Sequence, residues 1–254
     1  MDDNTATHVA VPGSDLSLAV RVTEGKGPAV FWLGGFRSDM VGGKANALAQ
    51  WGAAKGRKVV RFDYRGHGES GGAFEDFVLS DWLDDARRIH DGFLGEDTIA
   101  VGSSMGGWVA LLLAKALADE GRPLKGVVLI APAPDFTDLL MWPRLPDTIK
   151  QEVMDKGVAY LPSDYGDPTP ITRALFEDGR KHLIFNDHPI VTGCPVHILQ
   201  GIEDPDVPYT HALDLVTRLA AEDVVLTLIK DGDHRLSRDE DIARLISAVE
   251  TVAG

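Results

Sequence analysis

The residues GSSMG at positions 102–106 match the pattern G-x-S-x-G, in which a serine stands on a sharp turn between a strand and a helix. An apolar run over 98–101 precedes the motif, and a strongly apolar segment over 105–118 follows it. A side chain at Gly102 or Gly106 would crowd such a turn, and the positive end of the helix dipole near Ser104 favours a developing anion. The alternative is an ordinary helix cap. The context predicts instead that Ser104 is a nucleophile.

A serine hydroxyl needs a base to take its proton. His234 lies in KDGDH (230–234), a polar turn directly after the last predicted strand, where open α/β sheets place functional groups. His67, in DYRGHGES (63–70), also follows a strand and is a rival on position, although the glycines around it are typical of a tight turn. We therefore predict His234 as the base.

The base in turn needs a carboxylate to orient it and to stabilise its charged form. The turn GIEDPDVP (201–208) follows the penultimate predicted strand and offers Asp204 and Asp206. Alternating residues point in different directions, so only one of the two faces His234. A solvated acidic turn is the plain alternative, but the chain order serine, aspartate, histidine, each at a strand end, favours a functional site.

The anion formed by nucleophilic attack needs hydrogen-bond donors. The backbone N–H of Met105, directly after the serine, is one expected donor. A second is expected from the loop that follows the strand over 29–33, where Phe36 N–H is the first choice and Gly35 N–H the reserve.

The elements that must position these groups alternate between strands and helices. Strands are predicted at 16–22, 29–33, 58–63, 98–101, 126–130, 196–200 and 224–229, and helices at 43–55, 80–93, 105–118 and 238–252, with Ser80 as a helix cap. Runs such as GVVLI (126–130) show no alternation, which indicates burial on both faces. The pattern predicts an α/β fold in a single domain over 1–254, with a mostly parallel sheet covered by helices on both faces.

The stretch 132–195 breaks this alternation and contains nine of the fourteen prolines. A structureless loop of this length is improbable, so we predict a small, mostly helical cap insert at about 133–194. Its large apolar side chains would line an acyl pocket over the sheet, or they would form the core of the insert itself. The predicted pocket residues are Leu139, Leu140, Met141, Trp142 and Phe176.

Composition excludes several other functions. The 254 residues include 25 Lys and Arg against 39 Asp and Glu, and the resulting charge of −14 disfavours nucleic acid and anionic membranes as partners. The longest apolar run, near 108–118, is too short for a membrane span, and the N-terminus does not resemble a signal peptide. A single cysteine, Cys194, fits a reducing compartment such as the cytoplasm. Because H-E-x-x-H, paired cysteines, the P-loop and G-x-G-x-x-G are all missing, no metal or cofactor is expected.

Taken together, these residues resemble the α/β-hydrolase superfamily over essentially the whole chain. Within it, the sequence is most similar to the subfamily of the mitochondrial palmitoyl-protein thioesterase, also described as an acyl-glucuronide esterase, and its bacterial relatives. The shared stretches are GGFRSDM (34–40), RFDY (61–64), VGSSMGGW (101–108), MDKGV (154–158), LPSDY (161–165), CP (194–195), GIEDPDVP (201–208) and DHR (233–235).

The resemblance implies Ser104 as nucleophile, Asp204 as acid and His234 as base. It favours Asp204 over Asp206 because the acid of the family lies thirty positions before its histidine. It further implies a serine hydrolase that cleaves carboxylic esters or acyl-thioesters through an acyl-enzyme intermediate, acting on a small molecule or an acylated protein. Because the N-terminus does not resemble a targeting leader, the chain is expected to be similar to the bacterial, cytoplasmic relatives. A carboxylesterase of other specificity and a binding protein without turnover are the alternatives, and the oligomeric state is left open.

Overall fold

The computed structural model describes residues 5–162, 168–186, 189–221 and 223–254. Within these residues, one sheet of eight strands has the order β1-β2-β4-β3-β5-β6-β9-β10. The strands are β1 (Thr7–Ala10), β2 (Ser17–Thr23), β3 (Ala29–Leu33), β4 (Val59–Phe62), β5 (Thr98–Ser103), β6 (Gly126–Ile130), β9 (Val196–Gly201) and β10 (Val224–Ile229). The pairs β1–β2 and β2–β4 are antiparallel and the others are parallel. The predicted mostly parallel sheet is confirmed.

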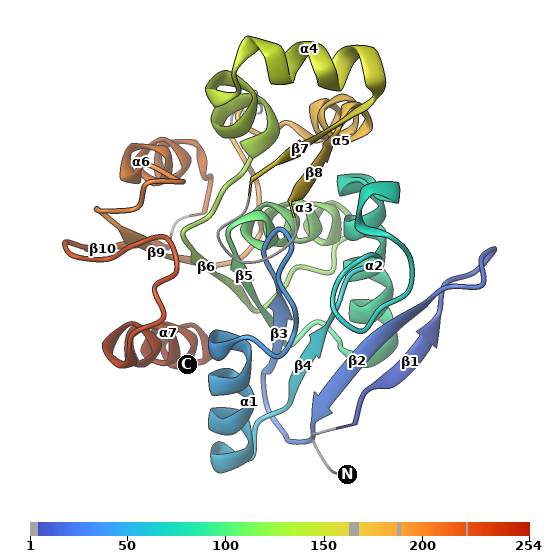
Figure 1. Ribbon diagram of the computed structural model, residues 1–254. Helices are drawn as coiled ribbons and strands as arrows, with labels where there is room; N and C mark the ends of the chain where they lie inside the picture. The colour runs from blue at the N-terminus through green and yellow to red at the C-terminus, as the bar shows by residue number, and fades with distance from the viewer. Residues whose placement is uncertain (1–4, 163–167, 187–188, 222) are drawn as a thin grey trace.

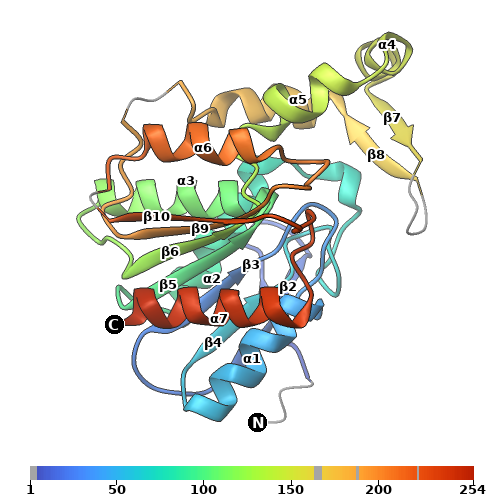
Figure 2. The ribbon, with the colours of Figure 1, turned by 90° about the vertical axis from the view of Figure 1, so that its left-hand side faces the viewer.

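Helices cover both faces of this sheet. They are α1 (Gly43–Lys55), α2 (Leu79–Phe93), α3 (Met105–Asp119), α6 (Tyr209–Arg218) and α7 (Asp239–Ala253). Helices α1 and α7 lie on one face, and α2, α3 and α6 lie on the other (Figures 1 and 2). The sheet is therefore the middle layer of three, and the carboxyl ends of its parallel strands meet at one edge.

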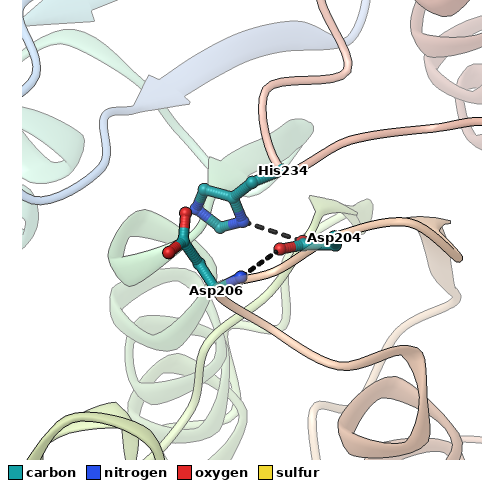
Figure 3. Close-up of side chains that lie close together, drawn as sticks. All are labelled: Asp204, Asp206 and His234. Atoms are coloured by element: carbon teal, nitrogen blue, oxygen red, sulfur yellow. Dashed lines mark hydrogen bonds and ion pairs between the residues drawn. The ribbon is translucent and has the colours of Figure 1, made fainter.

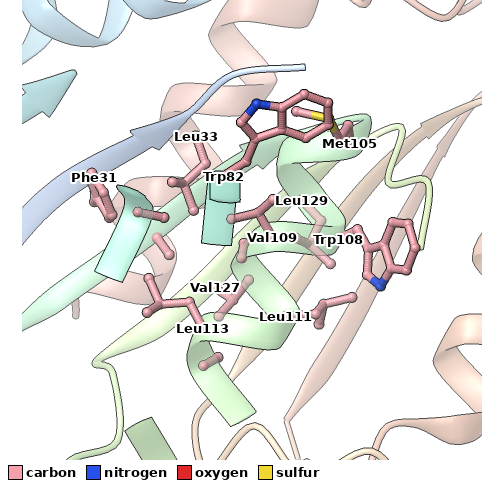
Figure 4. Packing of buried hydrophobic residues seen from close by; sticks show 14 of the residues in the cluster. Phe31, Leu33, Trp82, Met105, Trp108, Val109, Leu111, Leu113, Val127 and Leu129 are labelled. Atoms are coloured by element: carbon pink, nitrogen blue, oxygen red, sulfur yellow. The ribbon is translucent and has the colours of Figure 1, made fainter. Parts of the chain in front are cut away.

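Two apolar clusters join these layers. Trp82 of α2 and Trp108 of α3 pack against Phe31 and Leu129 of the sheet on one face (Figure 4). On the other face, Leu48 of α1 and other apolar side chains of α1 and α7 meet the reverse side of the same strands. Strands β3, β5 and β6 are buried at every residue, which explains why their sequences lack alternation.

The sequence did not predict β1 and α6. Strand β1 is a short edge strand with mostly exposed side chains, so it carries no hydrophobic pattern. Helix α6 follows Pro208 and does show apolar residues at helical spacing, since Ala212 and Leu215 are buried against the sheet.

The segment between β6 and β9 is only partly helical. It contains a π-helix (Thr137–Met141), the short turn Trp142–Arg144, α4 (Asp147–Lys156), α5 (Arg173–Gly179), the short turn Arg180–His182, and two antiparallel strands, β7 (Val158–Leu161) and β8 (Thr169–Thr172). Most of the regular structure in this segment is helical, and the pair β7–β8 is the part that the sequence did not predict. Residues 163–165 of the stretch LPSDY lie outside the described residues.

Ser80 is not the cap of α2, which begins one residue earlier, after Val78. Instead the N–H of Ser80 donates to Asp178 Oδ2 at 2.8 Å, and its hydroxyl donates to Asp178 Oδ1 at 2.8 Å. A carboxylate at the end of α5 therefore satisfies the first turn of α2 and ties the insert to the sheet domain.

No helix among the described residues is both long and apolar enough to cross a membrane.

Candidate active site

Ser104 stands on a turn between β5 and α3 with φ 53° and ψ −118°, a backbone conformation that residues with a side chain rarely adopt. A Cβ atom on Gly102 would lie 2.3 Å from the carbonyl oxygen of Gly106, and one on Gly106 would lie 2.1 Å from that of Leu33. Both positions therefore require glycine, as the sequence pattern predicted. The turn places the serine at the carboxyl end of a central strand.

His234 reaches the same edge of the sheet from the loop after β10. This loop lies directly on the end of β9, because a Cβ atom on Gly201 would be 2.2 Å from the carbonyl oxygen of Gly232. Close backbone packing thus brings the loops after β9 and β10 together. The Nε2 atom of His234 lies 3.1 Å from Ser104 Oγ, although 130 positions separate the two residues.

Asp204 is the carboxylate that holds His234. Its Oδ2 atom lies 2.8 Å from His234 Nδ1, and its Oδ1 atom accepts the N–H group of Asp206 at 2.9 Å (Figure 3). The same Oδ1 atom also accepts the N–H group of Val207 at 2.8 Å. Burial opposes the charged form, but the hydrogen bond from His234 and the two backbone donors lower the pKa of Asp204. A carboxylate can only accept from Nδ1, so Nε2 presents its lone pair to the serine.

Asp206 lies on the outer side of this arrangement. Only 6% of Asp204 is exposed, whereas Asp206 is exposed and donates its own N–H to Asp204. Between the two aspartates that the residues alone left open, the structure pairs Asp204 with the imidazole.

Asp204, Asp206 and His234 form the one group among the described residues whose side chains could together hold a metal ion. Their possible ligand atoms lie within 4.8 Å of one another. Both ring nitrogens of His234 already have partners, Asp204 and Ser104. A metal would have to replace one of these hydrogen bonds. The donor set therefore fits proton transfer better than metal binding.

The two residues predicted to supply oxyanion donors both lie next to the serine. Met105 is the first residue of α3, so its N–H has no partner within the helix. The loop that carries Phe36 lies directly against the serine, because a Cβ atom on Gly35 would be 3.5 Å from Ser104 Cβ. Phe36 and Met105 both line a cavity at Ser104.

Two cavities meet at Ser104, His234 and Phe36. The larger has a volume of about 580 Å³ and a mostly apolar wall formed by Met105, Ala133, Phe136, Leu140, Met141, Leu145, Pro146, Leu161 and Val207, with Arg144 and Asp206. The smaller, of about 320 Å³, is lined by Trp32, Gly35, Ser38, Asp39, Gly42, Gly43, Lys44, Ser103, Arg235 and Ser237. Burial and the neighbouring charge of Arg235 lower the pKa of Lys44 to about 8.

The predicted pocket residues are distributed differently from expectation. Leu140 and Met141 line the larger cavity, but Leu139 is 47% exposed and is not part of its wall. Trp142 and Phe176 contact each other at 4.8 Å between ring centroids, within the apolar core of the insert. Trp142 and Phe176 therefore belong to the core of the insert, which was the alternative to a place in the acyl pocket.

Sequence reasoning missed Arg144 and Phe136. Arg144 Nη1 donates to the carbonyl oxygens of Pro205 at 3.1 Å and Asp206 at 2.8 Å, which joins the insert to the turn that carries the acid. The ring of Phe136 packs between Phe36 and Trp108 at the floor of the larger cavity. The position of Phe136 shortly after a central strand was the signal that could have identified it.

The remaining candidates lie away from the serine. The Nε2 atom of His67 accepts the N–H of Arg37 at 3.2 Å, so His67 does not compete with His234 as the base. Cys194 is buried, and burial raises the pKa of its thiol to about 11, which disfavours a reactive thiolate.

The chain is similar to known proteins both in sequence and in structure. Residues 29–248 match the model of the alpha/beta hydrolase family. The chain is 33% identical over 237 residues to the human mitochondrial palmitoyl-protein thioesterase ABHD10, covering 92% of this chain and 76% of the human protein. The solved structure of mouse ABHD10 superimposes with a TM-score of 0.86 at 30% identity, covering 98% of each chain.

A candidate hydrolase from Agrobacterium vitis S4 superimposes with a TM-score of 0.91 at 47% identity, again covering 98% of each chain. The family model matches well over half of the sequence, and the curated relatives align over most of it. The chain therefore belongs to the alpha/beta hydrolase family.

Proposed function

We propose that this protein is a serine hydrolase that cleaves carboxylic esters or acyl-thioesters, with Ser104, His234 and Asp204 as its catalytic triad. The observation that carries the proposal is the continuous hydrogen-bonded chain from Asp204 through His234 to Ser104, with heavy-atom distances of 2.8 and 3.1 Å. The names of the curated relatives, palmitoyl-protein thioesterases, support an acyl-transfer reaction at this site.

In the first half of the reaction, His234 Nε2 takes the hydroxyl proton of Ser104 as Oγ attacks the acyl carbonyl carbon. The carbonyl oxygen becomes an oxyanion, and the N–H groups of Met105 and Phe36 donate to it. The imidazolium then gives its proton to the departing alcohol or thiol, and the acyl group remains on Ser104 as an ester.

In the second half, His234 takes a proton from water, and the resulting hydroxide attacks the acyl-enzyme. Collapse of the second oxyanion breaks the bond to Ser104 Oγ, which recovers its proton from His234. The products are a carboxylic acid and the regenerated serine. Asp204 keeps its negative charge throughout and stabilises the imidazolium.

The two cavities suggest how a substrate is divided. The larger has an apolar wall, which suits a hydrocarbon acyl chain, and its volume lies in the range of ordinary ligand sites. The smaller presents hydroxyl and charged side chains, which suit a polar leaving group. We assign the acyl chain to the first cavity and the leaving group to the second.

The proposal is tested by Ser104→Ala, with Ser247→Ala on the exposed side of α7 as control. We expect wild type and the control to hydrolyse p-nitrophenyl and thiocholine esters and to react with a fluorophosphonate probe. The Ser104→Ala variant should fold normally, lose labelling and lose at least about 10³-fold in kcat. Hydrolysis by this variant at the wild-type rate would show that Ser104 is not the nucleophile.

A further inference from the structure

The loop between β3 and α1, residues 34–42, carries the proposed oxyanion donor Phe36 and is held from outside. Its Arg37 N–H donates to His67 Nε2 at 3.2 Å, and its Met40 N–H donates to Asp63 Oδ1 at 2.6 Å. Arg37 has φ 56°, in the left-handed region that is unfavourable for a residue with a side chain. Because this conformation is costly, contacts beyond the loop are needed to hold it. Both contacts come from the turn after β4.

The hydrogen-bonding state of His67 follows from its two partners. Its Nδ1 atom lies 3.3 Å from the carbonyl oxygen of Arg65, which can only accept, so Nδ1 carries the hydrogen. Nε2 is then the acceptor that faces Arg37 N–H. His67 is 4% exposed, and burial, opposed by the hydrogen bond to Arg65, lowers its pKa to about 4, with the charge of Arg37 adding to the decrease. The ring is therefore neutral near pH 7 and keeps its lone pair.

An aromatic cluster fixes both the imidazole and the donor residue. The rings of Phe74 and Trp82 lie edge-on to His67, at 5.0 and 5.3 Å between centroids. The same two rings contact Phe36, at 4.9 and 6.0 Å. Phe74 and Trp82 therefore pack against both the side chain of Phe36 and the imidazole of His67, which accepts the N–H of the next residue, Arg37.

We propose that His67 is a positioning residue for the oxyanion site. It holds the N–H of Arg37, and with it the backbone directly after Phe36, so that the N–H of Phe36 in the preceding peptide stays directed at the reacting carbonyl. The inference rests on the proposed function. His67 lines neither of the two cavities at Ser104, so it acts through the loop and not on the substrate. Asp63, which accepts from Met40 N–H, secures the far side of the same loop.

The test compares His67→Phe, which fills the aromatic cluster but cannot accept a hydrogen bond, with His67→Gln, which offers an oxygen acceptor. His90→Phe is the matched control, since His90 is also buried and contacts an aromatic ring, Phe31, but lies in α2 away from the loop. For each protein we would measure the melting temperature, kcat and KM on p-nitrophenyl butyrate, and the inhibition constant of a trifluoromethyl ketone that forms an oxyanion on the serine.

We expect His67→Phe to lower kcat about 10- to 100-fold with little change in KM, because a donor displaced by a fraction of an ångström stabilises the transition state less. The inhibition constant of the ketone should rise by the same factor. His67→Gln should recover most of the loss, and His90→Phe should change the melting temperature but not kcat. Wild-type kcat and ketone affinity in His67→Phe, or an equal loss of kcat in His90→Phe, would overturn the proposal.

Fluorophosphonate labelling separates this failure from failure of the proposed function. If Ser104→Ala abolishes labelling while His67→Phe is labelled at the wild-type rate, Ser104 remains the nucleophile and the role of His67 is wrong. If Ser104→Ala labels and hydrolyses like wild type, the proposed function itself fails, and with it the role of His67.

Discussion

At the scale of single residues, the turn after β9 sets two aspartates two positions apart and gives them different environments. Asp204 is buried and bound to His234, while Asp206 is exposed. We expect Asp204→Asn to lower kcat by about 10³- to 10⁴-fold, because an amide no longer fixes the histidine tautomer. Asp206→Asn should change kcat/KM by less than about fivefold, as removal of an exposed charge does. Steady-state hydrolysis of a p-nitrophenyl ester measures both.

The pair of variants serves as its own control, because both remove one carboxylate charge from the same turn. Equal losses would mean that the electrostatic field of the turn matters and the hydrogen bond to His234 does not. A larger loss of kcat in Asp206→Asn than in Asp204→Asn would show that Asp206, and not Asp204, is the acid.

The residues that we propose for the reaction were largely indicated by the sequence, whereas those that line the larger cavity were predicted only in part, as Leu140 and Met141. Ser104 and His234 stand in short patterns at strand ends, which sequence displays directly. The choice of Asp204 required a resemblance to relatives, because two acidic residues shared one turn. Leu139 and Leu140 are neighbours of equal hydrophobicity, and only the π-helical turn that contains them decides that Leu140 faces the cavity.

At the scale of elements, two buried carboxylates hold the insert in place. Asp178 joins it to α2, and Asp135 joins its beginning to its end. Asp178 receives the N–H and hydroxyl of Ser80 at the start of α2. Asp135 receives the N–H groups of Ile184 and Phe185, both at 2.9 Å. The pKa values of these two groups move in opposite directions. Burial opposes the charge of Asp178, but hydrogen bonds from Ser80 and Lys181 lower its pKa, whereas burial raises the pKa of Asp135 to about 6.

These shifts predict different dependences of stability on pH. The charge of Asp178 stabilises the fold above its unfolded pKa near 3.8, and this contribution is lost only in stronger acid. The free energy of unfolding of wild type minus that of Asp178→Asn should therefore be the same at pH 7 and pH 5. For Asp135 the folded protein binds the proton more tightly, so stability declines as pH rises from about 4 to 6. The free energy of unfolding of wild type minus that of Asp135→Asn should therefore increase when the pH is lowered from 7 to 5.

Urea unfolding at the two pH values measures both differences, and each variant controls for the other. Asp178→Ala, which removes the acceptor for Ser80 altogether, should cost about 1 kcal/mol at pH 7. Two results would contradict the directions of these pKa shifts. One is a wild-type minus Asp178→Asn difference in unfolding free energy that becomes smaller at pH 5, and the other is a wild-type minus Asp135→Asn difference that is the same at both pH values.

Strands that are buried on both faces were predictable, whereas the exposed edge strand β1 and the β7–β8 pair were not. Strands β3 and β6 were predicted with the bounds that the structure has, because their sequences are continuous apolar runs. The strands β7 and β8 have only four residues each, and β8 contains a proline. Their buried and exposed residues do not alternate regularly, so their sequences carry no strand pattern. Ser80 shows the limit of local rules, because its partner is a carboxylate 98 positions away.

At the scale of the whole molecule, the turns after β5, β9 and β10 carry the three residues of the proposed triad, and the insert supplies much of the cavity wall. The sequence could indicate the three-layer architecture of helices, sheet and helices, since alternation of strands with helices and burial of the strands on both faces leave few other arrangements. It could not indicate the cavity, because the insert meets the sheet through scattered contacts such as Arg144 with Pro205 and Asp206. Under the proposed function, we therefore expect the junction between the two parts to set which acyl groups are accepted.

This junction leads to a prediction about acyl-chain length. Each methylene buried in an apolar cavity contributes up to about 0.8 kcal/mol, so kcat/KM of wild type should rise from acetyl to at least octanoyl p-nitrophenyl esters. Leu140→Trp, which fills the larger cavity, should lower kcat/KM for the octanoyl ester at least about tenfold and leave the acetyl ester within about threefold. Leu139→Trp adds the same bulk one residue away on an exposed side chain and should leave the whole profile unchanged. A flat wild-type profile, or the same profile in both tryptophan variants, would show that the acyl chain does not occupy the cavity beneath the insert.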